Sequence, residues 1–140
     1  MDQSKRSALI EFAKVERGFP EDSVCPVVPL DRFFEGNDDL GSIGCNLQRH
    51  PGVDQFSELF SSLLLRDDVT DIQVELSEIV EEDDTMWPFS ERVYVAGKID
   101  LAALQELLAT LEPDEVSVDD EPPSELAMKE FDLAYSVWWD

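Results

Sequence analysis

Apolar residues recur along the chain at two spacings, and these predict helices and strands in alternation. The strongest helical pattern follows Pro51, and a second follows Asp100, a residue type that begins helices well. A weaker pattern covers residues 5–17 and ends at Gly18. The two strong stripes comprise Phe56, Leu59, Phe60, Leu63 and Leu64, and Leu101, Leu104, Leu107, Leu108 and Leu111. We expect both stripes to pack on the same face of one sheet.

Alternation of apolar and polar residues predicts the strands. It is clearest at residues 71–76, and its phase fails at Glu78, which indicates a bulge or the end of the strand. The apolar, glycine-punctuated run at 41–47 predicts a buried strand. Shorter alternating patterns predict three further strands at 92–98, 116–118 and 135–139. The last pattern buries only one of Trp138 and Trp139.

The order of these elements from residue 41 predicts the fold class. It reads strand, helix, strand, strand, helix, strand, with an extra C-terminal strand, which is the split βαβ or ferredoxin-like arrangement of α+β proteins. Residues 1–36 supply an N-terminal helix, a proline-rich linker and a short helical turn at 30–35, and residues 37–140 form the α+β core. A chain of 140 residues suffices for one hydrophobic core, so we expect a single domain over 1–140.

Charge narrows the possible partners. The chain has 33 acidic and 10 basic residues, a net charge of −23, and residues 71–140 contain 20 of the acids but only three of the bases. A field of this sign repels nucleic acid and anionic membranes and attracts basic surfaces. We therefore expect a basic protein surface as partner, and neither nucleic acid nor membrane. The sequence does not predict an oligomeric state.

The N-terminal segment and the cysteines predict the compartment. No apolar run at the N-terminus has the length of a signal peptide, and no window approaches a membrane span, which favours the cytoplasm. Cys25 and Cys45 lie twenty positions apart without CxxC spacing, so we expect reduced thiols, with Cys45 buried.

Residues 81–90 are the most informative loop. Four consecutive acids precede two aromatic residues, and together they form the candidate partner-binding set: Glu81, Glu82, Asp83, Asp84, Trp87 and Phe89. One interpretation is a hot spot in which the aromatic side chains anchor a basic partner that the acids attract. The other, which is the commoner role of aromatic side chains, is that Trp87 and Phe89 cover the edge of the sheet while the acids face water.

Residues 35–45 suggest a second class of function. Asn37, Asp38 and Asp39 resemble the start of a calcium loop, but glycine and the bidentate glutamate are missing at their required positions, which favours a tight turn. The single histidine, His50, follows Cys45 by five residues, a weak pair that fits a turn before the helix better than a catalytic site. We therefore assign no catalytic, cofactor-binding or metal-binding residue and expect no cofactor.

Three sequence strings carry a resemblance to a known kind of protein. FFEGNDDLGSIGCNL at 33–47, MWPFSERVYV at 86–95 and the terminal VWWD resemble those of small acidic bacterial proteins of uncharacterised function. In size and charge the chain is also similar to immunity proteins that neutralise bacterial toxins.

Our leading hypothesis is a non-catalytic cytoplasmic interaction module whose acidic face binds a basic protein, such as a toxin that it inhibits. The alternatives are a small-molecule or metal-dependent enzyme that uses residues 35–45 with His50, and a nucleic-acid mimic.

Overall fold

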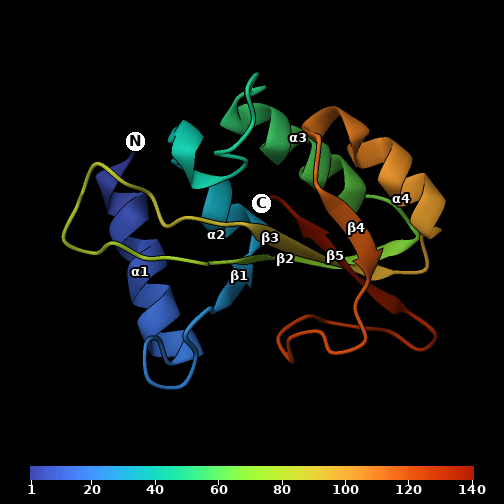
Figure 1. The fold of residues 1–140 in the computed structure, drawn as a ribbon. Coiled ribbons are helices and arrows are strands. Elements are labelled where there is room, and N and C mark those ends of the chain that lie inside the picture. The colour runs from blue at the N-terminus through green and yellow to red at the C-terminus, as the bar shows by residue number, and fades with distance from the viewer.

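A five-stranded antiparallel sheet forms the centre of the computed structural model, which describes residues 1–140 (Figure 1). The strands are β1 (Val27–Pro29), β2 (Val69–Glu75), β3 (Arg92–Gly97), β4 (Glu115–Val118) and β5 (Leu133–Trp138). The helices are α1 (Gln3–Arg17), α2 (Leu30–Phe34), α3 (Val53–Leu64) and α4 (Leu101–Leu108), with 3-10 turns at Leu40–Ser42 and Ala109–Leu111. The α+β class is therefore confirmed.

The strand order is β1-β2-β3-β5-β4, and every neighbouring pair is antiparallel. Strand β5 lies between β3 and β4, which α4 connects, so this half of the sheet is one split βαβ unit. A ferredoxin-like sheet contains two such units, and the expected first strand at 41–47 does not form. Only Ile43 of that run pairs, through an isolated bridge to Ser90. The ferredoxin-like arrangement is therefore not confirmed.

Local interactions explain why residues 41–47 do not extend. The carboxylate of Asp39 accepts a hydrogen bond from the amide of Gly41 at 2.9 Å and begins a 3-10 turn. Gly44 then adopts a positive φ of 64°, which reverses the direction of the chain. Ile43, in the middle of the run, is fully buried as predicted. The backbone bends just before it, in the 3-10 turn, and just after it, at Gly44.

The segment before residue 36 belongs to the same core as the rest of the chain. Helix α1 ends at Gly18 in the left-handed conformation, as expected, and α2 confirms the predicted turn. The linker prediction is wrong for β1, because Val28 pairs with Val74 at the edge of the sheet. Leu9 and Phe33 join the same buried cluster as the sheet residues.

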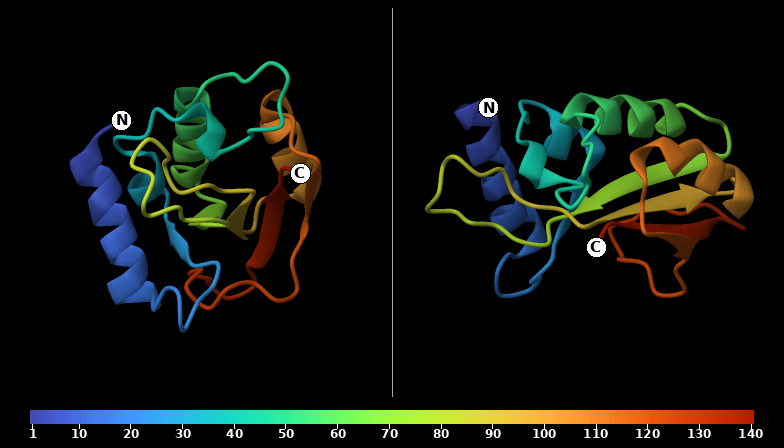
Figure 2. Two further views of the ribbon diagram at one scale, coloured as in Figure 1. Left: turned by 60° about the vertical axis from the view of Figure 1, so that its left-hand side comes forward. Right: turned by 45° about the horizontal axis from the view of Figure 1, so that its top comes forward.

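Helices α3 and α4 cover one face of the sheet, as their stripes predict (Figure 1). Phe56, Phe60, Leu104 and Leu108 are fully buried there. The stripes predict Leu64 and Leu107 in the same layer, but each side chain is 39% exposed. Each lies at one edge of its stripe, where the helix turns toward the solvent. The other face of the sheet is covered in part by the connection at 119–132, which passes beneath β3 and β5 (Figure 2).

Leu63 and Leu107 provide a matched test of this packing. Replacing Leu63, which is 2% exposed, by alanine should lower the free energy of unfolding by about 2–5 kcal/mol. The same change at Leu107 should cost less than about 1 kcal/mol, because water already reaches that side chain. Urea unfolding measures both values, and equal costs would contradict the packing of α4 described above.

Trp138, the last residue of β5, is half-buried and Trp139, the residue after it, is buried, in agreement with the alternation of the sequence. The indole nitrogen of Trp139 donates a hydrogen bond to the carbonyl of Leu111 at 2.9 Å. No helix combines the length and the apolar character needed to cross a membrane.

Candidate functional site

The acidic loop between β2 and β3, residues 79–88, projects past the sheet and lies beside α1 (Figures 1 and 2). Its base is closed by backbone hydrogen bonds between Glu78 and Phe89, one of them 2.8 Å from the amide of Phe89 to the carbonyl of Glu78. Ser77 adds a further bond of 2.7 Å to the carbonyl of Phe89. The two ends of this ten-residue loop are therefore held together by backbone hydrogen bonds.

Arg6 of α1 determines the path of this loop. Its guanidinium donates hydrogen bonds to the carbonyl oxygens of Val80 at 2.9 Å, Asp83 at 2.8 Å and Met86 at 2.8 Å. A fourth, longer bond of 3.3 Å reaches the carbonyl of Glu81. Arg6 is only 5% exposed, so a buried cation satisfies the inward-facing carbonyls of the loop.

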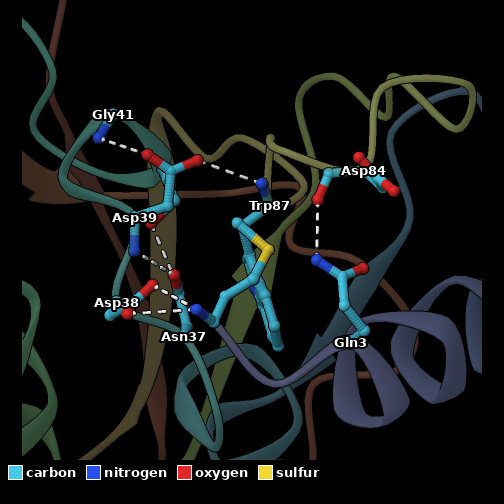
Figure 3. A network of polar contacts seen from close by, with 9 residues as sticks. Gln3, Asn37, Asp38, Asp39, Gly41, Asp84 and Trp87 are labelled. Atoms are coloured by element: carbon cyan, nitrogen blue, oxygen red, sulfur yellow. Dashed lines mark hydrogen bonds and ion pairs between the residues drawn. The ribbon is translucent and has the colours of Figure 1, made fainter.

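Two further side chains of α1 hold the outer part of the loop. Lys14 forms an ion pair with the carboxylate of Glu81. The amide of Gln3 donates a hydrogen bond of 2.8 Å to the carbonyl of Asp84 (Figure 3). The N-terminal helix thus contacts the loop along its length.

The four acids of the loop have different environments. Asp83 turns back into the loop and accepts hydrogen bonds from the hydroxyl of Thr85 at 2.6 Å and from its amide at 3.0 Å. These bonds hold the pKa of Asp83 below its usual range. Glu81 is paired with Lys14, whereas Glu82 and Asp84 are exposed and form no ion pair. Two free carboxylates therefore face the solvent from a loop whose backbone is fixed.

Trp87 does not lie on this surface. Its side chain is 1% exposed and belongs to the main hydrophobic core, so its interpretation as an exposed anchor is wrong. The amide of Trp87 donates a hydrogen bond of 3.0 Å to the carboxylate of Asp39 (Figure 3). Phe89 is half-buried at the stem of the loop. Of the six residues predicted to bind a partner, the acids alone provide exposed contact groups.

The Asn/Asp/Gly run closes on itself, as the turn interpretation predicts. Besides its bond to Gly41, Asp39 donates its own amide to the side-chain oxygen of Asn37 at 3.0 Å. The side-chain amide of Asn37 donates to the hydroxyl of Ser42 at 2.9 Å. Asp38 turns outward and lies 3.1 Å from the ammonium group of Met1 (Figure 3). The structure contains no cluster of three or more His, Cys, Asp or Glu side chains that could hold a metal ion.

The two segments that the sequence singled out meet in space. Besides the bond between Trp87 and Asp39, the amide of Ser90 donates to the carbonyl of Ser42 at 2.7 Å. A cleft of about 330 Å³ lies between the segments. Its lining consists of Asp39, Gly41, Cys45, Glu78, Thr85, Met86, Trp87 and Phe89. The sequence did not predict this contact, because the residues that bond, Asp39 to Trp87 and Ser42 to Ser90, are 48 positions apart.

His50 is held by backbone groups on both sides of its ring. Its Nδ1 accepts a hydrogen bond from the amide of Gly52 at 2.9 Å, so the proton lies on Nε2, which donates to the carbonyl of Ile43 at 2.6 Å. Both nitrogens are therefore engaged in closing the turn before α3. A general base needs one of them free, so the geometry does not support the catalytic role considered for His50.

The cysteines are both exposed, which corrects the expectation that Cys45 is buried. Cys45 follows Gly44 at the outer side of the 3-10 turn, where the chain has already left the core. Desolvation, together with the nearby carboxylates of Glu75 and Glu91, raises the pKa of the Cys25 thiol. A raised pKa lowers the thiolate fraction at neutral pH, and the thiolate is the nucleophilic form.

The role of Arg6 is the main feature that sequence reasoning missed. The sequence of α1 does indicate that Arg6 is buried. It lies three, four and seven positions before Leu9, Ile10 and Ala13, on the same buried face of the helix. A basic residue within an apolar stripe indicates a buried polar partner. The sequence near Arg6 does not indicate which groups bond to it, because the carbonyls at 80–86 lie more than 70 positions away.

These features define a small acidic α+β domain in which a loop is fixed by the N-terminal helix. The chain belongs to the family described as "Uncharacterized protein YfbO family", whose model matches residues 4–139. It is 28% identical over 123 residues to "Uncharacterized protein YfbO" of Escherichia coli (strain K12), an alignment that covers 85% of this chain and 86% of that protein. No solved structure matches the chain. The expected resemblance to a bacterial protein family is thereby confirmed.

The excess of carboxylates should make the stability of the domain sensitive to salt. Only five ion pairs form, one of them to the N-terminal ammonium group, so most of the 33 acids have no cationic partner. Like charges repel in the compact state, and salt screens that repulsion. We expect the Tm near neutral pH to rise between low and moderate sodium chloride. A flat or falling Tm in calorimetry would mean that the attractive pairs outweigh the repulsion.

Proposed function

We propose that the chain is a non-catalytic, cytoplasmic protein-interaction module whose acidic loop binds a basic protein surface. The observation that carries this proposal is the buried guanidinium of Arg6, which fixes the backbone of the loop while Glu82 and Asp84 face the solvent. A fixed loop loses little conformational entropy on binding. Its two free carboxylates are therefore preorganised for Lys or Arg side chains of a partner.

The contribution of the loop is electrostatic. With Trp87 in the core, Met86 is the one exposed large apolar side chain of the loop, beside the exposed acids Glu81, Glu82 and Asp84. Charged groups at an interface govern the association rate and the choice of partner more than the affinity. The net charge of −23 extends the same attraction over a longer range. A cationic toxin neutralised by this chain is one partner of the required chemistry, and small acidic immunity proteins provide the analogy.

A matched pair of double variants tests the proposal. Glu82→Gln with Asp84→Asn removes two charges from the loop, and Glu58→Gln with Glu106→Gln removes two exposed charges from α3 and α4. Proteins retained from a native extract by the immobilised wild-type chain are compared with those retained by each variant, at low and moderate salt. We expect a basic protein that the wild type and the helix variant retain and the loop variant loses.

The association rate of that purified protein then gives the decisive measurement. The loop variant should associate about tenfold more slowly at low salt, and the difference should shrink as salt rises. Equal slowing by both double variants would show that only the net charge matters, and the acidic loop would have no specific role. Retention that neither variant changes would also reject the proposal.

A further inference from the structure

The connection between β4 and β5, residues 119–132, exposes an aromatic side chain. Phe131 is 82% exposed, and two other exposed apolar residues flank it in the sequence, Met128 at 43% and Leu133 at 49%. Every other Phe, Trp and Tyr of the chain, including Trp87, is buried or half-buried. Three exposed apolar residues within six positions are unusual on a chain with this many charges, and exposed apolar surface of this kind marks interaction sites.

The backbone of Phe131 has a conformation that favours glycine or asparagine over phenylalanine. The amide of Asp132 donates to the carbonyl of Lys129 at 3.0 Å, which closes a four-residue turn with Phe131 as its third residue. The φ angle of Phe131 is 69°, in the left-handed region that glycine and asparagine adopt readily at this position. A bulky side chain there is strained, and because it is exposed, packing within the fold does not compensate for that strain.

The turn that presents Phe131 is fixed to the sheet. Asp132, whose side chain is 1% exposed, accepts hydrogen bonds from the hydroxyl of Thr70 at 2.6 Å, the amide of Lys129 at 2.9 Å and the ammonium group of Lys98 at 2.9 Å. Burial alone would raise the pKa of Asp132, but these three bonds outweigh it and hold the pKa at about 2. The carboxylate is therefore charged throughout the physiological range, and the turn stays closed.

A second attachment fixes the chain before the turn. The connection at 119–132 runs along the face of the sheet opposite α3 and α4 (Figure 2), and its Leu126 is buried against Ala96 and Ala134. The amide of Ala127 donates to the carboxylate of Asp71 at 2.8 Å. With both sides of the turn attached, Phe131 is held outward on a rigid support, the arrangement that makes an aromatic anchor effective at an interface.

The charges around Phe131 define the chemistry of its partner. Residues 119–132 contain a single basic residue, Lys129, and six acids, which are Asp119, Asp120, Glu121, Glu125, Glu130 and Asp132. Repulsion opposes a second copy of a chain with net charge −23, and it opposes an anionic membrane in the same way. A basic protein surface is complementary in charge, and it needs an apolar pocket to receive the ring.

We propose that Phe131 is the anchor of a second interaction surface and inserts into an apolar pocket, rimmed by Lys or Arg, of a basic protein partner. This surface does not depend on the acidic loop, because the two lie at opposite ends of the sheet. Leu133 pairs with Gly97 at the end of β3 that is remote from the loop, whereas the acidic loop joins β3 at Arg92 (Figure 1).

Photo-crosslinking from position 131 identifies the partner. Phe131→p-benzoylphenylalanine and, as a control, Val24→p-benzoylphenylalanine are irradiated in a native extract, and the crosslinked peptides are sequenced. Val24 is 77% exposed and lies in the loop before β1, so it matches Phe131 in accessibility. We expect crosslinks to a basic protein from position 131 alone. Equal crosslinking from both positions, or crosslinks only to a second copy, a lipid or an acidic protein, would overturn the proposal.

Binding of the purified crosslinked protein completes the test. Phe131→Gly removes the ring and relieves the left-handed strain, so the variant should fold with an unchanged or higher Tm while its affinity falls about 30-fold. Val24→Ala should bind within twofold of the wild type. Unchanged affinity of Phe131→Gly would reject the anchor, and a lowered Tm would show that the ring serves the fold. The variant with Glu82→Gln and Asp84→Asn, measured in parallel, reports on the acidic loop independently.

Discussion

Replacing Trp87 by alanine should lower the free energy of unfolding by about 3–5 kcal/mol, although the residue follows four consecutive acids in a loop. Its side chain is 1% exposed within the main core, so the substitution leaves a cavity that the fixed loop cannot fill. Urea unfolding measures the loss. A cost below about 1 kcal/mol would mean that the ring leaves the core in solution, and the exposed-anchor interpretation would then return.

Phenylalanine substitutions at Trp87 and Trp139 provide the control. The indole nitrogen of Trp87 has no hydrogen-bond partner, whereas that of Trp139 donates to the carbonyl of Leu111. Trp139→Phe leaves a buried carbonyl unsatisfied, which costs about 1–3 kcal/mol beyond the lost volume, and Trp87→Phe does not incur this cost. We therefore expect Trp139→Phe to be the more destabilising change.

Replacing Arg6 by alanine should lower the free energy of unfolding by roughly 2–5 kcal/mol, because it leaves several loop carbonyls without a donor. Amide hydrogen exchange at residues 80–86 should accelerate more than exchange in the sheet, since the guanidinium is the main internal support of that loop. Both quantities can be measured on one protein sample.

Lys14→Ala is the matched control for Arg6→Ala. It removes a cation of the same helix that contacts the same loop, but through an ion pair whose side chains are 36% and 53% exposed. Exposed pairs of this kind contribute about 0–1 kcal/mol. If the two variants cost the same, the buried guanidinium is not what orders the loop.

The helices and the longer strands were predictable because their patterns run over several turns or alternations. The stripe of α3 has five apolar positions at helical spacing, and β2 alternates over six residues, so each pattern specifies both an element and its buried face. The stripes also place Leu64 and Leu107 inward, which is wrong. Each lies at one edge of a wide stripe, and a helix that rests on one face of a sheet buries only the middle of such a stripe.

Elements of three residues were not predictable. Strand β1 contains Pro29 and follows two other prolines, a composition typical of a linker. It forms a strand because it pairs with β2 at the edge of the sheet, where proline is tolerated. At 41–47 the sequence predicts a strand where the structure has a turn. Side-chain bonds from Asn37 and Asp39, outside the apolar run, set a turn where composition favours a strand.

The candidate site was predictable in its charges and, from the commoner role of aromatic side chains, in the burial of Trp87. The exposure of Phe131 was not predictable. Three of the four acids, Glu81, Glu82 and Asp84, are exposed, as a run of acids is expected to be. The segments around Trp87 and Phe131 are held by bonds from Asp39 to the amide of Trp87 and from Thr70 to Asp132, and both partners lie far away in the chain. Sequence patterns describe local periodicity and do not contain such contacts.

The position of β5 between β3 and β4 has a consequence for synthesis on the ribosome. Strand β4 has no neighbour other than β5, which follows it in the chain by fourteen residues. Until residues 133–138 emerge, β3 has an open edge and β4 has none of its ladder hydrogen bonds. The sheet therefore closes by insertion of a strand into a gap, a late step with long-range contacts, and a nascent chain shorter than 133 residues presents an unpaired edge to chaperones.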